Sequence, residues 1–118
     1  GKLNTYEVIQ KGSKIAVIGL GAFYSLGEKA AELIAEKTGV QPTLVNPYYI
    51  TGLDEALLDD LKKDHEIVVT LEDGILDGGF GEKIARYYGA SDMKVLNVGL
   101  KKEFLDRYDV QEVLEKII

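Results

Sequence analysis

Two adjacent carboxylates, Glu72 and Asp73, are the side chains of this sequence whose position best suits acid–base chemistry. They end a run of five strand-favouring residues, Ile67–Leu71, and the glycine-rich segment Gly78–Gly81 follows them. In parallel α/β sheets, binding sites form where strands end and helices begin. Consecutive strand residues point in different directions, so the two carboxylates are badly placed to share a proton or a metal ion. Either one could act alone as an acid or a base, although a solvated loop carboxylate is the commoner case.

A second candidate is the segment Gly19–Gly21, which lies between an apolar strand and a helical pattern, as dinucleotide-binding turns do. Tyr24 stands where the third glycine of that fingerprint belongs. Asn46 replaces the acidic residue that is expected at the end of the second strand. A tight strand-to-helix turn is therefore favoured over a nucleotide site.

The helix that follows this turn would offer backbone N–H groups to a small anion. The candidates for such an anion site are Gly21, Ala22 and Phe23. Other chemistry has little support, because the chain has no cysteine, and its one histidine, His65, precedes a strand at the edge away from these residues. No Ser or Thr lies in a recognisable nucleophile turn. We therefore expect no catalytic residue and no metal ligand among the candidates.

Alternating strand and helix patterns must position these residues. The predicted strands are 6–9, 15–18, 43–45, 67–71 and 95–98. The predicted helices are 22–38, 54–63, 79–88 and a last one that begins at Asp109. Such alternation predicts a three-layer α/β/α sandwich with a mostly parallel sheet and right-handed crossovers. Four strand ends then gather at one edge of the sheet: Gly19–Gly21, Asn46–Pro47, Glu72–Asp73 and Asn97.

The composition narrows the class of protein. A chain of 118 residues predicts one domain, and 46% hydrophobic with 29% charged residues is ordinary for a soluble globular protein. A net charge of −6 argues against sequence-independent nucleic-acid binding, and no apolar run approaches the length of a membrane helix. We expect a cytoplasmic protein with no nucleic-acid or membrane partner. Because the sequence starts at Gly1 without an initiator Met, we also expect it to be cut from a longer chain.

Six short segments occur in an order that is typical of one enzyme family. They are Ile15–Phe23, Val45–Pro47, Leu53–Asp54, Val69–Asp73, Gly78–Gly81 and Asn97–Leu100. In these segments the chain resembles the C-terminal domain of thiamine-diphosphate-dependent transketolase-family enzymes, and among them the 1-deoxy-D-xylulose-5-phosphate synthases most. The resemblance covers about residues 6–118. Each segment alone is weak evidence for the family, but the six segments in this order are specific to it.

The resemblance implies a five-stranded sheet whose first strand runs antiparallel, in the last of three domains. Thiamine diphosphate, Mg²⁺ and the activating glutamate would lie in the other two domains, so this domain itself would bind no cofactor. It would help to build a homodimer with the other domains or subunits of the parent enzyme, and it would border the substrate channel. The parent would transfer two-carbon units and serve isoprenoid biosynthesis. The candidates for channel residues are Asn46, Tyr48, Glu72 and Asp73.

The chain departs from the family pattern in the segment Asn46–Asp54, where the synthases carry Asn-x-Arg-Phe-x-Lys-Pro-Leu-Asp. Tyr48 replaces the arginine, Thr51 the lysine and Gly52 the proline. A Leu-Pro-Asp-x-Phe pattern also reads differently at Leu100–Phe104. Arginine binds a phosphate through two hydrogen bonds, which tyrosine cannot replace. Two alternatives to a sugar-phosphate enzyme therefore stay open: a paralogue with another acceptor, and a stand-alone interaction or scaffold module.

Overall fold

One mixed sheet organises the computed structural model, which describes residues 4–74 and 79–101. Its strand order is β1-β3-β2-β4-β5, with β1 antiparallel to β3 and the other pairs parallel. The strands are β1 (Glu7–Gln10), β2 (Lys14–Gly19), β3 (Thr43–Asn46), β4 (His65–Asp73) and β5 (Lys94–Leu100). The helices are the short 3₁₀ helix η1 (Gly21–Phe23), α1 (Tyr24–Thr38), α2 (Glu55–Leu61) and α3 (Phe80–Tyr88). This arrangement confirms the predicted fold class, including the antiparallel edge strand.

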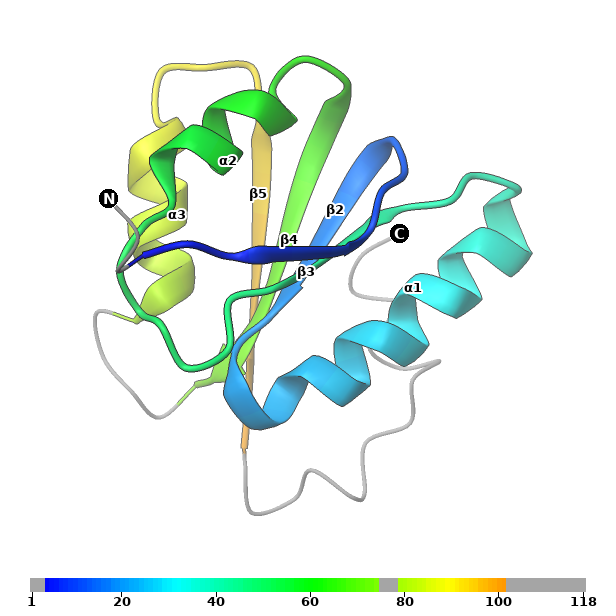
Figure 1. The fold of residues 1–118 in the computed structure, drawn as a ribbon, viewed down its shortest axis with the longest axis horizontal. Coiled ribbons are helices and arrows are strands. Elements are labelled where there is room, and N and C mark those ends of the chain that lie inside the picture. The colour runs from blue at the N-terminus through cyan, green and yellow to red at the C-terminus, as the bar shows by residue number, and fades with distance from the viewer. Residues whose placement is uncertain (1–3, 75–78, 102–118) are drawn as a thin grey trace.

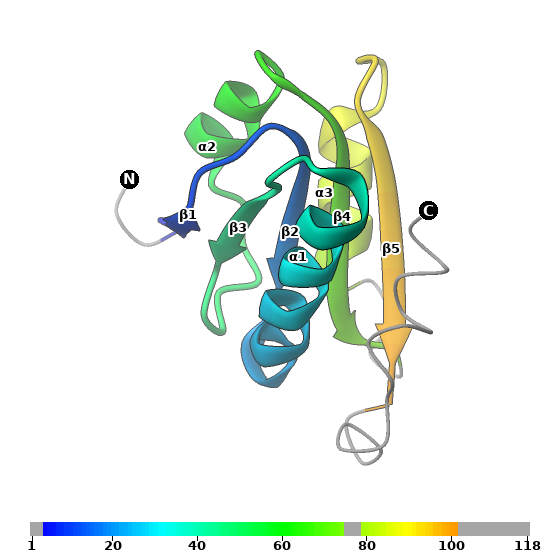
Figure 2. The same ribbon diagram turned by 90° about the vertical axis from the view of Figure 1, so that its right-hand side faces the viewer.

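The helices cover both faces of the sheet. Helix α1 lies on one face, and α2 and α3 lie on the other (Figures 1 and 2). Right-handed crossovers require this division, because the chain moves from β2 to β3 in one direction and from β3 to β4 and β5 in the other. The chain therefore reverses its direction across the sheet at β3, and β2 becomes the central strand.

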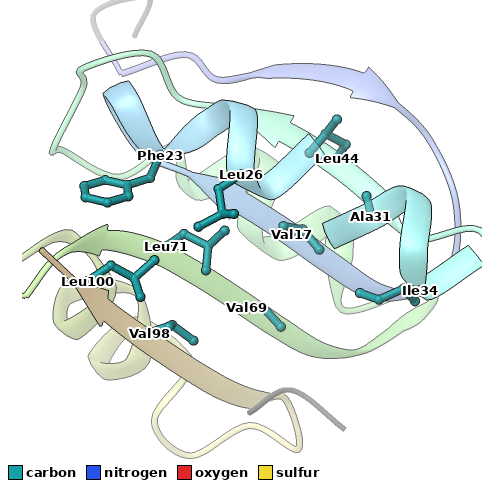
Figure 3. Close-up of a cluster of buried hydrophobic side chains, with 10 residues drawn as sticks. All are labelled: Val17, Phe23, Leu26, Ala31, Ile34, Leu44, Val69, Leu71, Val98 and Leu100. Carbon is teal, nitrogen blue, oxygen red and sulfur yellow. The ribbon is translucent and has the colours of Figure 1, made fainter. Parts of the chain in front are cut away.

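Each face of the sheet has its own apolar core. The core on the α1 face, shown in Figure 3, consists of Val17, Phe23, Leu26, Ala31, Ile34, Leu44, Val69, Leu71, Val98 and Leu100. The core under α2 and α3 consists of Tyr6, Ala16, Ile18, Val45, Leu58, Leu61, Val68, Phe80, Ile84 and Tyr88. Because both faces of β2 and β4 are covered, consecutive residues of these strands are apolar.

Local sequence signals set most element ends. Gly39 ends α1 in the left-handed conformation, with φ 74°, as predicted for a C-cap glycine. Asp54 caps α2, since its Oδ1 accepts a hydrogen bond from the Leu57 N–H at 3.2 Å. Several predicted boundaries were wrong. Helix α1 begins at Tyr24 because Gly21–Phe23 form a tighter 3₁₀ turn, and β4 extends two residues beyond the predicted strand at each end. Strand β5 continues to Leu100, and α2 already ends at Leu61.

The predicted last helix, which begins at Asp109, lies outside the described residues, as do Gly78 and Lys102–Phe104 of the family segments. In the part of the chain that the structure describes, no helix is long and apolar enough to cross a membrane.

Candidate functional site

The carboxyl ends of the parallel strands lie at one edge of the sheet, and the predicted candidates lie there together. The chain leaves β2 toward α1 on one face and leaves the neighbouring β4 toward α3 on the other. Such a switch point is where open α/β sheets form ligand crevices. The two strand ends are tied directly, because the Leu20 N–H donates to the Leu71 carbonyl at 3.0 Å.

The turn after β2 uses backbone donors that an anion would need. Gly21 has a φ of 57°, a conformation that glycine adopts easily. Its N–H donates to the Tyr48 carbonyl at 2.6 Å, and the Phe23 N–H donates to the Leu20 carbonyl at 3.1 Å. These two donors would have to exchange partners before they could bind an anion. Anion binding at Gly21, Ala22 and Phe23 therefore stays a prediction. It would cost the free energy of the two internal hydrogen bonds that the anion replaces.

Asn46 and Tyr48 form a compact turn at the end of β3. The Asn46 Oδ1 accepts a hydrogen bond from the Tyr48 N–H at 2.7 Å, and Tyr48 has a φ of 60°, which is uncommon for a residue other than glycine. The Tyr48 hydroxyl donates to Glu7 Oε1 of β1 at 2.6 Å. This hydrogen bond is the main cause that raises the pKa of Tyr48. The turn therefore presents a neutral tyrosine hydroxyl that is already held by a carboxylate.

Glu72 is a strand residue that holds the start of a helix. Its Oε1 accepts a hydrogen bond from the Gly81 N–H in the first turn of α3 at 3.1 Å. A carboxylate is stabilising at this position because the N-terminus of a helix carries partial positive charge. The backbone of Gly79 also lies close to the carboxylate, since a Cβ on Gly79 would come within 2.9 Å of both Glu72 oxygens. Glu72 therefore positions α3 against the end of β4.

Asp73 is also part of β4 and not of the loop that follows it. It pairs with Leu100 of β5, and its side chain is half-buried. Glu72 and Asp73 are consecutive residues of one strand, so they point to opposite faces of the sheet, as the sequence predicted. All four channel candidates therefore lie at one edge of the sheet, and their role in a channel stays a prediction.

A polar pair at this edge was not among the predicted site residues. Thr70, which is fully buried, donates through its hydroxyl to Asn97 Oδ1 of β5 at 2.7 Å. Both side chains lie directly against Gly81, where a Cβ would come within 2.5 Å of Thr70 Oγ1 and 2.6 Å of Asn97 Oδ1. The last glycine of Gly78–Gly81 was the only signal in the sequence of this close approach.

The opposite edge of the sheet carries a buried histidine. His65 begins β4, and its ring nitrogens lie 2.7 Å from Thr43 Oγ1 and 2.7 Å from Asp64 Oδ1. The predicted position of His65, away from the candidate site, is confirmed. The hydroxyl of Thr43 also accepts from the Gly12 N–H at 2.9 Å, so this chain of bonds links β3, β4 and the turn before β2. Because His65 and Thr43 are buried, the arrangement is a structural one.

An open hollow of about 630 Å³ lies at this same edge, remote from the carboxyl ends of the strands. Its lining consists of Lys62, His65, Glu66, Ile67, Ser91, Asp92, Met93 and Lys94. Most of these side chains are exposed and of mixed charge. Among residues 4–74 and 79–101, no three or more His, Cys, Asp or Glu side chains gather in a way that could hold a metal ion.

The sequence matches the family described as "Transketolase, C-terminal domain" over residues 4–118. This chain belongs to that family. Two curated relatives are both named 1-deoxy-D-xylulose-5-phosphate synthase. The protein of Symbiobacterium thermophilum is 35% identical over 112 residues, and that of Clostridium beijerinckii is 32% identical over 113 residues. The alignments cover 93% and 94% of this chain but only 17% and 18% of those relatives, so this transketolase C-terminal domain corresponds to less than a fifth of their length.

Solved structures agree on the fold. A chain described as "Split gene transketolase, inactive beta4 tetramer" superimposes with a TM-score of 0.80 at 21% identity, covering 99% of this domain and 41% of that chain. A 2-oxoglutarate:ferredoxin oxidoreductase from Magnetococcus marinus superimposes with a TM-score of 0.55 at 14% identity, covering 97% of this domain and 19% of that chain. At these identities the likeness extends to the transketolase C-terminal fold alone.

Proposed function

We propose that this chain is the C-terminal domain of a thiamine-diphosphate-dependent transferase related to 1-deoxy-D-xylulose-5-phosphate synthase. Its role is to support dimer assembly and to border the substrate channel, while other domains of the parent carry the chemistry. One observation supports this most: the family match spans residues 4–118, while the chain spans only 17–18% of the first curated relatives. In a parent protein of the relatives' length, more than four fifths of the residues would lie outside this domain.

The polar groups at the candidate edge favour a positioning role over a catalytic one. The Gly21 N–H, the Tyr48 hydroxyl and the Glu72 carboxylate each make a hydrogen bond within the chain. Thiamine diphosphate needs donors for its phosphates and ligands for a divalent ion, and the described residues offer no such combined cradle. We therefore assign the cofactor and Mg²⁺ to the remainder of the parent, which would be a cytoplasmic homodimer.

The acceptor substrate of the parent is proposed to differ from that of the synthases. Tyr48 stands at the position of the family arginine, and its hydroxyl is bonded to the Glu7 carboxylate. The Glu7 carboxylate repels a phosphate, and the Tyr48 hydroxyl already donates its only proton to Glu7, whereas a guanidinium binds a phosphate. This edge therefore suits an acceptor that carries no phosphate at the end nearest Tyr48.

The alternative is a stand-alone interaction or scaffold module that derives from such a domain. The replacements at Tyr48, Thr51 and Gly52 favour it, because they remove the arginine, the lysine and the proline of the family pattern. An enzyme role then predicts intact thiamine-binding domains in the same chain or in a partner subunit, and a scaffold role does not.

The size of the native gene product decides between these functions. Immunoblotting of an extract from the source organism should give a band far above 13.0 kDa, or a 13.0 kDa band that co-purifies with a thiamine-binding subunit. The purified protein should then form carbon–carbon bonds only when thiamine diphosphate and Mg²⁺ are supplied. A free 13.0 kDa protein without such a subunit would refute the enzyme role and leave the scaffold.

A further inference from the structure

The large apolar side chains that the described residues expose come from two neighbouring segments of the chain. They are Val8 and Ile9, which are 40% and 44% exposed, and Tyr48 and Tyr49, which are 47% and 78% exposed. Val8 and Ile9 belong to the edge strand β1, and the tyrosines belong to the loop that follows its neighbour β3. Val8 lies on the same face of the strand as Tyr6, which is buried in the core under α2 and α3, whereas Glu7 points to the other face. We therefore call Glu7, Ile9, Tyr48 and Tyr49 the β1 edge surface.

The members of the β1 edge surface are brought together by long-range contacts. Glu7 pairs with Asn46 in the sheet, and the Tyr48 hydroxyl donates to Glu7 Oε1 at 2.6 Å. Tyr49 packs its ring over Gly21, where a Cβ would come within 2.7 Å of it. Figure 2 shows β1 as the outermost strand of the sheet, with the loop from β3 beside it. Exposed apolar residues that gather in this way mark an interaction surface.

The centre of the β1 edge surface is negatively charged. Glu7 is exposed, and its carboxylate accepts the Tyr48 hydroxyl while keeping capacity for further donors. The same charge acts on Tyr24. Its pKa is raised mainly by burial, and further by the carboxylates of Glu28 and Glu7. A complementary partner therefore offers apolar side chains around an arginine or lysine.

Two other occupants fit this surface less well. A β-bulge between Val8 and Gln10 interrupts the regular edge, and bulges oppose the addition of another strand. A second copy of the chain in a two-fold interface would bring the Glu7 carboxylates of both copies into the same contact, and such like charges repel.

The position of the surface indicates which partner covers it. Asn4, the first described residue, packs its side chain against Gly52 in the same loop as Tyr48 and Tyr49. A C-terminal domain that continues from preceding domains is therefore entered directly beside the β1 edge surface. The relatives are more than five times longer than the segment they share with this chain.

We propose that the β1 edge surface is the docking site of this domain on the cofactor-binding part of the parent enzyme, which contributes apolar side chains and a basic residue to Glu7. The inference rests on the proposed function. Apolar contacts of Ile9, Tyr48 and Tyr49 provide the burial, and the charged contact at Glu7 sets the orientation.

Hydroxyl-radical footprinting tests this directly. The probe is the complete native protein, as one chain or as the domain with its thiamine-binding subunit, compared with the isolated chain. We expect the oxidation of Tyr49 to fall severalfold in the complete protein, while Met93, at the far edge of the sheet, changes little. Oxidation of Tyr49 at the isolated-chain rate in an active parent would overturn the docking site and leave the proposed function intact.

Matched lysine substitutions give a second readout. Ile9→Lys should raise the dissociation constant of a two-subunit parent by about tenfold or more. In a fused parent it should split the domain from the rest as a separate calorimetric transition. Ser91→Lys, at another exposed position on the far edge, should do neither. Equal behaviour of the two variants would overturn the inference.

The remaining outcomes also decide. Tyr49 protection in the isolated chain, together with dimers in sedimentation that Ile9→Lys dissociates, would make a second copy the occupant and refute the proposal. If no longer chain and no thiamine-binding subunit exists, the proposed function and the docking site fall together.

Discussion

Two helical glycines should respond in opposite ways to the same substitution. Gly81 lies in the first turn of α3 and Gly27 lies within α1. Alanine is favoured over glycine in a helix by up to about 1 kcal/mol, so propensity alone predicts that both variants are stabilised. At Gly81, however, the atoms around the added methyl group should make the substitution destabilising.

At Gly81 the methyl group has no room. It would lie 2.5 Å from Thr70 Oγ1 and 2.6 Å from Asn97 Oδ1, and Thr70 is a short, fully buried side chain that cannot swing away. Forcing extra volume into a packed site costs about 1–3 kcal/mol. The Thr70–Asn97 hydrogen bond and the bond from the Gly81 N–H to Glu72 are strained at the same time. The net expectation for Gly81→Ala is a loss of about 1–2 kcal/mol.

At Gly27 the nearest atoms are Leu71 Cδ1 and Val17 Cγ1, both at 3.4 Å, which is ordinary van der Waals contact. Gly27→Ala should therefore stabilise the domain by about 0.5–1 kcal/mol. Urea unfolding followed by circular dichroism measures both variants against the wild type. A Gly81→Ala variant as stable as Gly27→Ala would show that α3 can move away from β4 and β5, and it would refute the close packing argued for this edge.

Three further predictions concern other parts of the fold. Asp54→Ala should lower the free energy of unfolding in urea by about 1–2 kcal/mol, because Asp54 caps α2 and its other oxygen accepts the Tyr6 N–H at 2.9 Å. The control is Asp60→Ala, which removes an exposed ion pair and should lower it by under about 0.5 kcal/mol. Burial raises the pKa of Tyr6 to about 12 from the usual 10.0, so the folded state holds this proton more tightly than the unfolded one, and stability should fall as the pH rises from 10 to about 12. An unfolding midpoint that is constant over that range would contradict this. His65→Ala should cost about 2 kcal/mol or more, since it removes a buried partner of Thr43, and thermal unfolding at pH 8 measures it.

Local patterns predicted the fold well because the signals for its elements are short-range. The apolar run at 15–18 became β2, and Gly39 adopts the left-handed cap that its position after a helical pattern indicated. The gathering of strand ends at one edge follows from parallel strands alone, so it too was predictable. The boundaries were less certain, because the 3₁₀ turn at Gly21–Phe23 depends on a hydrogen bond to distant Tyr48.

The candidate site was harder to predict because its contacts join residues far apart in the sequence. Tyr48 bonds to Glu7 across 41 positions, which requires the antiparallel pairing of β1 with β3. Thr70 meets Asn97 only through the register of β4 with β5. Glu72 looked like a candidate for acid–base chemistry, and nothing in its neighbourhood showed that its carboxylate faces the start of α3. Pairing and register, which set these contacts, join strands that are distant in the sequence, so a local pattern of residues does not predict them.

The use of polar groups at the candidate edge links the fold to the proposed role. A catalytic edge keeps donors and charges directed at the substrate, and the rest of the fold bears the cost of leaving them without internal partners. At this edge Asn46 closes a turn, Glu72 holds α3 and the Gly21 N–H joins the turn after β2 to the loop after β3. These bonds use the polar groups of the edge within the domain and leave an aromatic and acidic outer rim at Glu7, Tyr48 and Tyr49. An edge whose polar groups are bonded within the domain, with such a rim outside, is compatible with the proposed role of bordering a channel and docking on the remainder of the parent.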